Sequence, residues 1–412
     1  MNWWIAIIGV FLGPLLNLAI YSLAYFPRPI SPWQKKSSAT QPAKTSIKPP
    51  AIAFLPIVGW LFRWSERSEF GNWFWLRPML IELVFPVGFV WLYNFVMSGA
   101  LLVELQTVSP PAVEIESFVF IAALFGLLIV ATFIDFDERT IPDAVTVPGT
   151  VFALFGSSFF PNWRLKEYEP SGVDALRNLV PNSPYGEFYP EWLQSSTTGL
   201  VLAILFWAAW CFSLMDRVLI TRRGWSKAAL YFFEILRRSP STLSRLGMLL
   251  VGVGGIVLAY NLLSQDGWKG LFSSLFGMAM GGGLVWSFRI VASAVMGREA
   301  LGFGDVTLMA MVGAFTGWQA VWISFFLAPL FGLLFVITIY LITKDGSTPF
   351  GPYLSLSVAI TVLKWKEIWP YSSPLFFAPG AMIALLSVLL LTLALSLGAV
   401  VFVRTRLQGD AA

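Results

Sequence analysis

The stretch that decides the fold runs from Phe118 to Asp143 and reads FVFIAALFGLLIVATFIDFDERTIPD. As far as Phe133 it carries no charged side chain, and an acidic cluster that begins with Asp135 and Asp137 follows at once. An apolar run close to the ~20 residues that cross a bilayer predicts a transmembrane helix. Carboxylates at the end of such a helix are costly when ionised and unpaired, so the cluster is a candidate functional site.

The whole chain has the composition of an integral membrane protein. Hydrophobic residues make up 57% of the sequence and charged residues only 12%, and several apolar runs are long enough to span a bilayer. A soluble fold is therefore excluded, and the lipid bilayer is an expected partner. The net charge of +4 is spread over a few loops, which gives no support for nucleic-acid binding.

The chain contains a single cysteine, Cys211, and no histidine. A disulfide framework, a zinc site built from cysteine and histidine, and a histidine-dependent catalytic triad are all excluded. We therefore expect no metal site. Acid–base chemistry falls to carboxylates, lysines or tyrosines.

The distribution of lysine and arginine predicts the topology, because basic loops stay on the cytoplasmic side. We expect an all-α, polytopic bundle of about 11 transmembrane helices, with the N-terminus outside and the C-terminus inside. The first helix lacks a basic leader and a small-x-small cleavage site, so it is expected to be a retained anchor. The expected segments are a first transmembrane helix (1–25), a basic cytoplasmic loop (26–78), helices 2–4 with the acidic cluster (79–160), an insertion with an outside loop, two helices and a basic cytoplasmic loop (161–264), a transmembrane core (265–364), and an extra C-terminal helix and tail (365–412).

A second aspartate, in Gly302-Phe303-Gly304-Asp305, stands where a polar turn becomes an apolar helix. The topology places it at the same cytoplasmic edge as Asp135. Two facing carboxylates can share a proton, so that one activates a water and the other protonates the leaving group. Gly302 and Gly304 would let an extended substrate backbone approach Asp305. The alternative is that Asp305 is a helix N-cap and that the glycines merely shape the turn.

Two further aspartates of the acidic cluster invite other interpretations. Pro142 disfavours helix at the residue before it, so Asp143 is expected to be the N-cap of the next helix. Asp137 either tunes Asp135 as a neighbouring negative charge or is solvated at the membrane surface, and we favour the second interpretation.

Four stretches together resemble the type IV prepilin peptidase family, which are polytopic aspartyl proteases of the Gly-x-Gly-Asp type. They are Arg298 to Leu308, Gly313 to Trp318, Ile134 to Asp143, and Pro349-Phe350-Gly351-Pro352. The resemblance implies that Asp135 and Asp305 are catalytic and that proteolysis needs no cofactor. It implies a leader peptidase of the bacterial inner (plasma) membrane that acts at the cytoplasmic face. The substrates would be precursors of type IV pilins or type II secretion pseudopilins, cut between a basic leader and an apolar helix.

The N-terminal part also resembles this family, in the stretches Gly13 to Tyr21, Ser31 to Trp33 and Arg77 to Glu82. In the family this region is linked to methylation of the new N-terminus with S-adenosylmethionine, which makes Gly13, Asn17 and Glu82 candidate methylation residues. Simpler interpretations are a hydrogen-bonding residue within a helix for Asn17 and an interfacial charge for Glu82.

The chain departs from the family pattern at two points. The paired Cys-x-x-Cys motifs of many members are absent, which puts methylation in doubt but not proteolysis. Thr307 stands where the family usually has lysine, and loss of that cation would change the pH at which the two carboxylates work.

Two other functions compete with this interpretation. One is a presenilin-like Gly-x-Gly-Asp intramembrane protease, which Ile141-Pro142-Asp143 and Pro349-Phe350-Gly351-Pro352 do not favour. The other is a non-enzymatic transporter or scaffold whose carboxylates carry protons or ions. For a protease, Asp135 and Asp305 should lie within hydrogen-bond reach or be bridged by one water. The 161–264 insertion should form a helix pair at the periphery, away from them.

Overall fold

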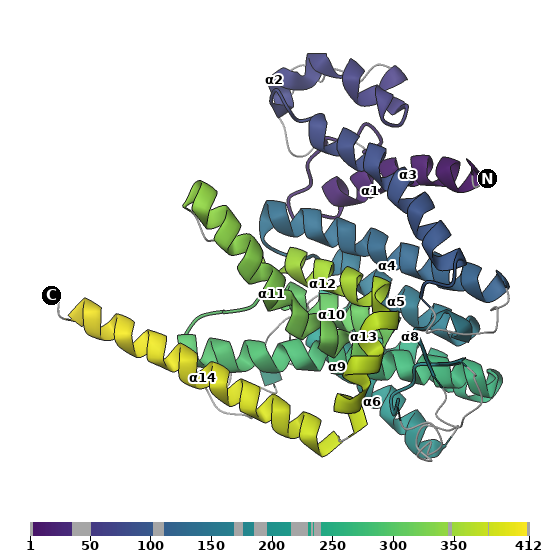
Figure 1. Ribbon diagram of the computed structural model, residues 1–412, viewed down its shortest axis with the longest axis vertical. Coiled ribbons are helices and arrows are strands. Elements are labelled where there is room, and N and C mark those ends of the chain that lie inside the picture. Colours follow the sequence, from purple (N-terminus) through teal and green to yellow (C-terminus); the bar gives the residue numbers. More distant parts are fainter. Residues whose placement is uncertain are drawn as a thin grey trace.

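The computed structural model describes residues 3–34, 51–101, 111–168, 176–184, 196–215, 230–231, 234, 240–344, 348–377 and 379–409. In this part the protein is a bundle of helices with one small hairpin (Figure 1). The larger helices are α1 (Trp3–Ser22), α3 (Leu76–Met97), α4 (Pro111–Glu138), α5 (Asp143–Phe159), α6 (Thr197–Ser213), α8 (Pro240–Leu262), α9 (Gln265–Met296), α10 (Phe303–Thr316), α11 (Trp318–Thr343), α12 (Gly351–Leu363), α13 (Trp365–Ser372) and α14 (Pro379–Gly409).

Shorter elements fill the connections between these helices. The hairpin pairs two antiparallel strands with Glu167 opposite Arg177, and it lies in the expected outside loop. It is the one departure from an all-α fold in the described residues. The short elements are η1 (Ala51–Phe54), η2 (Val58–Phe62), η3 (Trp64–Glu66), α2 (Arg67–Phe70), η4 (Pro161–Trp163), β1 (Lys166–Tyr168), β2 (Leu176–Asn178) and η7 (Ser373–Phe377).

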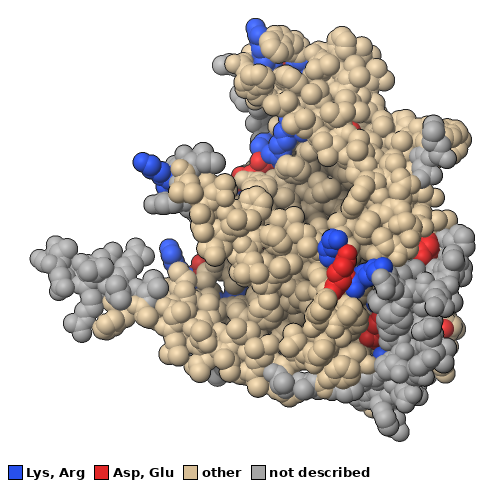
Figure 2. Space-filling view, in the orientation of Figure 1, with Lys and Arg blue, Asp and Glu red and all other residues tan. Residues whose placement is uncertain are grey.

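The bundle is that of a helical membrane protein. Seven helices in the described part are long and apolar enough to cross a bilayer: α1, α3, α4, α8, α9, α11 and α14. Three apolar helices, α6, α10 and α12, are shorter. Charged side chains on the face in Figure 2 gather in a few clusters and leave a wide surface without them. The expected count of about 11 spans and their orientation stay predictions.

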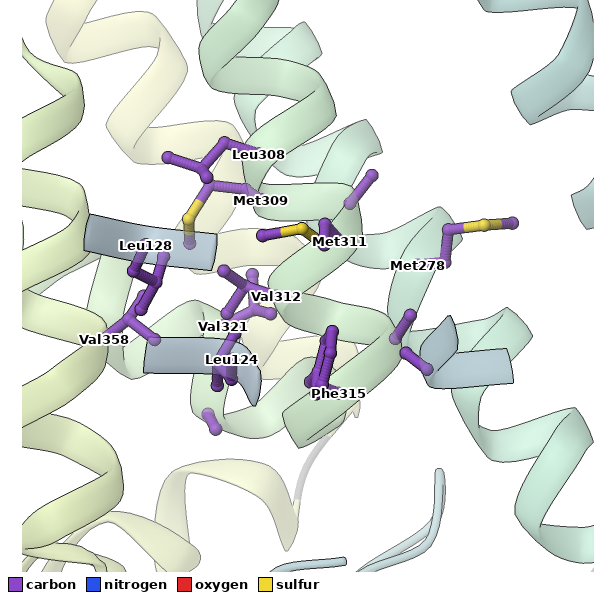
Figure 3. Close-up of a cluster of buried hydrophobic side chains, with 14 of the residues drawn as sticks. Leu124, Leu128, Met278, Leu308, Met309, Met311, Val312, Phe315, Val321 and Val358 are labelled. Carbon is purple, nitrogen blue, oxygen red and sulfur yellow. The ribbon is translucent and has the colours of Figure 1, made fainter. Parts of the chain in front are cut away.

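Helix α10 is the centre of the bundle. Every residue from Asp305 to Thr316 is buried. It packs closely against α9 through glycines: a Cβ on Gly277 would lie 2.1 Å from the carbonyl oxygen of Gly313. Such small residues let two helix backbones approach each other. Figure 3 shows the surrounding core, in which side chains of α10 such as Met309 lie among those of the neighbouring helices.

The two ends of the bundle differ. At one end α4 finishes while α10 and α12 begin. At the other end the hairpin region is bonded to the starts of α9 and α11. Arg164 is buried and donates to the carbonyl of Gly270 at 3.0 Å, and Gln319 donates to the carbonyl of Val180 at 2.7 Å. Residues 161–168 and 176–184 therefore lie at the end opposite to the aspartates.

The expected basic loop 26–78 contains a small folded unit of short helices, at the top of Figure 1. Its centre is a buried ion pair in which Arg63 Nε donates to Glu66 at 2.9 Å. The guanidinium also lies 4.8 Å from the ring centre of Trp60. Because a buried charge needs such partners, this pair indicates a defined fold between η1 and α2.

The helices of the 161–264 segment pack against each other and against α9 at the edge of the bundle. Trp207 Nε1 of α6 donates to the carbonyl of Leu249 in α8 at 3.2 Å, and Phe206 packs edge-on to Phe276 of α9. The expectation that this pair stays away from the aspartates is only partly met, because Arg245 of α8 reaches Asp143. Most of the basic cytoplasmic loop expected at 216–245 lies outside the described residues.

Candidate active site

A cavity of about 450 Å³ opens where α4 ends and α10 begins. Three aspartates line it, namely Asp135, Asp143 and Asp305. Gly302 and Gly304 line it as well, so the residues singled out from two distant stretches meet in one place. A concave site with converging carboxylates is the expected setting for acid–base chemistry.

Asp135 lies in the last turn of α4, because the helix continues to Glu138 instead of ending before the aspartate. The helix stops at Arg139, which has a left-handed φ of 56° and donates its backbone N–H to the carbonyl of Asp135 at 2.8 Å. The side chain of Asp135 is buried. Its Oδ2 accepts the backbone N–H of Gly351, at the start of α12, at 3.0 Å.

Gly351 is a site residue that we did not single out from the sequence. A Cβ there would lie 2.5 Å from Asp135 Oδ2 and 2.9 Å from Ile141 Cδ1, so no larger residue fits. The signal available in the sequence was the Pro349-Phe350-Gly351-Pro352 stretch, of which Pro349 and Phe350 also line the cavity. Tyr25 lines the cavity too, and the sequence around it gave no signal.

Asp305 is the third residue of α10, and the N-cap is Gly302, so the alternative of Asp305 as N-cap is wrong. Its buried carboxyl accepts the backbone N–H of Gly302, as the acidic partner of a capping box does. The negative charge also lies at the favourable end of the helix dipole. The carboxyl group of Asp305 therefore both stabilises the start of α10 and lines the cavity.

The two glycines before Asp305 differ. A Cβ on Gly304 would stand 2.8 Å from both the Cβ and the carbonyl oxygen of Ile141, so Gly304 is required for packing. A Cβ on Gly302 would come no closer than 3.6 Å to Asp305 Oδ2. The open space beside the carboxylate is therefore at Gly302.

Comparison with known proteins finds similarity to one family. Residues 242–337 match the model of the type IV leader peptidase family. This matched segment, about a quarter of the chain, is similar to that family. The matched segment contains Asp305 but not Asp135, and it begins inside α8.

Three curated proteins named prepilin leader peptidase/N-methyltransferase are similar to the chain. That of Pseudomonas putida is 29% identical over 38% of this chain and 57% of its own length. That of Pseudomonas aeruginosa is 40% identical over 24% and 37%, and that of Escherichia coli (strain K12) is 32% identical over 25% and 47%. The matches thus span between about a third and somewhat more than half of these relatives' lengths. No solved structure matches the chain.

Asp143 does not cap a helix, and that expectation is wrong. The N-cap of α5 is the extended Pro142, and Asp143 follows as the first helical residue. Its carboxylate forms an ion pair with Arg245 at 3.2 Å, with the two side chains 31% and 26% exposed. The pair places α8 at the rim of the aspartate cavity.

Asp137 is paired with two arginines, which the interpretation as a solvated group did not include. Its side chain is only 16% exposed and forms ion pairs with Arg28 and with Arg77, the latter at 2.7 Å. Next to it, Glu138 accepts the backbone N–H groups of Tyr25 and Phe26 at 2.8 and 2.9 Å. These contacts fasten the end of α4 to the chain that follows α1 and to the start of α3.

The candidate methylation residues Gly13, Asn17 and Glu82 also meet, between α1 and α3. Asn17 Nδ2 donates to Glu82 Oε1 at 2.9 Å, and Glu82 Oε2 accepts the backbone N–H of Ile57 at 2.7 Å. A Cβ on Gly13 would lie 3.1 Å from the Cα of Glu82. Glu82 is 2% exposed, so it is not an interfacial charge.

The contacts of Glu82 give no support for a bound S-adenosylmethionine at this place. Both carboxylate oxygens of Glu82 are already used by protein donors. Asn17 keeps one buried oxygen without a partner in the described part, but the described cavities are not lined by either residue. The arrangement instead holds Ile57, whose φ of 63° is strained for a β-branched residue.

Thr307 and Cys211 are both buried within helices of the bundle. Thr307 is buried and its hydroxyl donates to the carbonyl of Gly304 at 3.1 Å. Cys211 is buried in α6. The described residues contain no group of three or more Cys, Asp or Glu side chains placed to hold a metal.

Proposed function

We propose that the protein is a prepilin leader peptidase, an aspartic endopeptidase that removes the leader from precursors of type IV pilins or type II secretion pseudopilins. The observation that carries this proposal is the cavity lined jointly by Asp135 and Asp305. The match of residues 242–337 to the leader peptidase family and the names of the relatives support it.

In the proposed reaction the two carboxyl groups share one proton. The ionised carboxylate takes a proton from water, and the resulting hydroxide adds to the scissile carbonyl carbon. The protonated partner donates a hydrogen bond to the carbonyl oxygen, and a proton then passes to the amine as the C–N bond breaks. The backbone N–H of Gly351 orients Asp135 throughout.

The proposed setting is the bacterial inner membrane, with about 11 spans, the N-terminus outside and the C-terminus inside. The cavity would then face the cytoplasm, where precursors carry their basic leader. The shared position of Asp135 and Asp305 at one end of the bundle supports this arrangement.

Only the peptidase is proposed. The relatives' names include an N-methyltransferase, but in this chain Glu82 and Asn17 are bonded to each other, and Glu82 is also bonded to Ile57. These bonds use both carboxylate oxygens of Glu82, so the proposal includes no methylation step. The family match also favours a leader peptidase over a presenilin-like protease or a transporter.

Cleavage of a precursor by membranes that contain the protein tests the proposal. We expect Asp135→Asn and Asp305→Asn each to lower the cleavage rate by at least about 10²-fold, the order of contribution of a general acid or base. The control is Asp266→Asn, an exposed aspartate at the opposite end of the bundle. The proposal is refuted by full cleavage in both variants, or by no cleavage with the native protein at matched levels.

A further inference from the structure

An apolar groove runs along the side of the bundle between α3, α4 and α12. It consists of a cavity of about 450 Å³ and a neighbouring one of about 340 Å³. The two share Val84, Phe85, Ile129 and Phe133, and together we call them the lateral groove. The one charged residue among those that line it is Arg77, which is paired with Asp137.

The lateral groove has the length of several helical turns. Its lining on α4 extends from Ala122 to Phe133, which corresponds to about 16 Å at 1.5 Å per residue. This is about half of the ~30 Å apolar core of a bilayer. The α3 side is open to the surroundings, because Val84 is 62% and Trp91 is 52% exposed. Figure 2 shows the uncharged surface hollowed in this part of the face.

The lateral groove ends beside the aspartate cavity. Thr132 and Phe133 line it and precede Asp135 on α4 by less than one turn. On the other side the stretch 349–352 separates the two spaces: Pro349 and Phe350 line the aspartate cavity, whereas Pro352 lines the lateral groove. Gly351, between them, holds Asp135.

Small residues on three helices indicate that the occupant is a helix. Gly88 of α3, Ala122 of α4, and Ser355 and Ala359 of α12 all line the lateral groove. Small side chains let helix backbones approach closely in a membrane, where association depends on packing. At Gly88 an added Cβ would meet no atom within 4 Å. The groove is therefore deeper at Gly88, where it leaves a notch that a partner helix can fill. A lipid acyl chain needs no such notch.

We propose that the lateral groove binds the apolar transmembrane helix of the precursor and thereby places the peptide bond before that helix in the aspartate cavity. This inference rests on the proposed peptidase function. It assigns two parts of the substrate to two sites: the helix to α3, α4 and α12, and the scissile bond to Asp135 and Asp305.

The first test fills the lateral groove with Gly88→Phe, which has open space around it. The matched control is Gly283→Phe on α9, an exposed helical glycine that also has no atom within 4 Å of an added Cβ and does not line the groove. Two substrates are compared, a full-length precursor in vesicles and a soluble peptide with the leader and cleavage site but no apolar helix. We expect kcat/KM for the precursor to fall about tenfold or more in Gly88→Phe, the scale of a blocked apolar pocket. Peptide cleavage and the control should stay within about twofold of the native protein.

The second test needs no turnover. A photoreactive benzophenone side chain at position 88 or 283 is placed in the Asp135→Asn, Asp305→Asn double variant and irradiated with the precursor. Adducts with the apolar helix of the precursor are expected at position 88 and not at 283.

The two tests separate the inference from the function. If Gly88→Phe cleaves the precursor normally, or if position 88 forms adducts with lipid alone, the lateral groove is not the helix site. If the native protein cleaves neither substrate, the peptidase proposal fails, and the adducts alone decide whether the lateral groove binds the helix.

Discussion

Gly351→Ala is a sharp test of how Asp135 is held. The new Cβ would stand 2.5 Å from Asp135 Oδ2, where ordinary contact begins at 3.4 Å, so the carboxylate or the start of α12 must move by nearly 1 Å. This movement would break the hydrogen bond from the Gly351 backbone N–H, now 3.0 Å long.

The expected cost has two parts. Loss of a hydrogen bond to a charged group costs about 1.5–3 kcal/mol, and overpacking of a tight contact costs about 1–3 kcal/mol. Because misplacement of a reacting group by about 1 Å can cost about 10²-fold in rate, we expect cleavage to fall by that order.

The assay is thermal unfolding in detergent together with precursor cleavage at matched protein levels. Gly283→Ala is the control, because a Cβ there meets no atom within 4 Å and alanine favours the helix by up to about 1 kcal/mol. If Gly351→Ala unfolds like this control and cleaves at the native rate, Gly351 does not position Asp135.

Two further predictions concern the rim of the cavity and the opposite end of the bundle. We expect Asp143→Asn to keep cleavage within about threefold at matched protein levels, because a part-exposed ion pair is worth about 1 kcal/mol or less, whereas Asp135→Asn abolishes it. Equal loss from both would place Asp143 in the reaction. At the other end, burial lowers the pKa of Lys166 to about 8 from its usual 10.5. Its folded-state pKa is the lower one, so its contribution to stability is present above about pH 10.5 and is lost as the pH falls through about 8. Lys166→Met should flatten this dependence in thermal unfolding between pH 8 and 10.5, whereas the exposed Lys364→Met should not; an unchanged slope in Lys166→Met would contradict the assignment.

The sequence predicted a helical membrane protein, and the apolar helices of bilayer length confirm it. The match of residues 242–337 to the leader peptidase family supports the predicted resemblance. Apolar runs of bilayer length have few alternatives to a helix, because lipid offers no partner for free backbone groups. The expectation that Asp135 and Asp305 are catalytic stays a prediction, although both line one cavity.

The details that the sequence missed depend on partners far along the chain. Asp137 was interpreted as solvated because its arginines, Arg28 and Arg77, belong to other segments. Asp143 was expected to cap its own helix, but Pro142 occupies the N-cap and Arg245 of α8 supplies the partner. The bond from Gly351 to Asp135 involves a backbone N–H, which leaves no signature in the side-chain pattern.

The burial of α10 has a consequence for water. Beyond Asp305 the helix is buried as far as Thr316, with apolar side chains such as Met309 and Phe315 among its residues, and residues 161–168 and 176–184 lie at its far end. We therefore expect water in the aspartate cavity to stop near the first turn of α10. A proton or ion carried along this helix would have no polar group to move to through its apolar middle. A single water confined beside two carboxylates is what hydrolysis requires, whereas a transport pathway must continue to the other side.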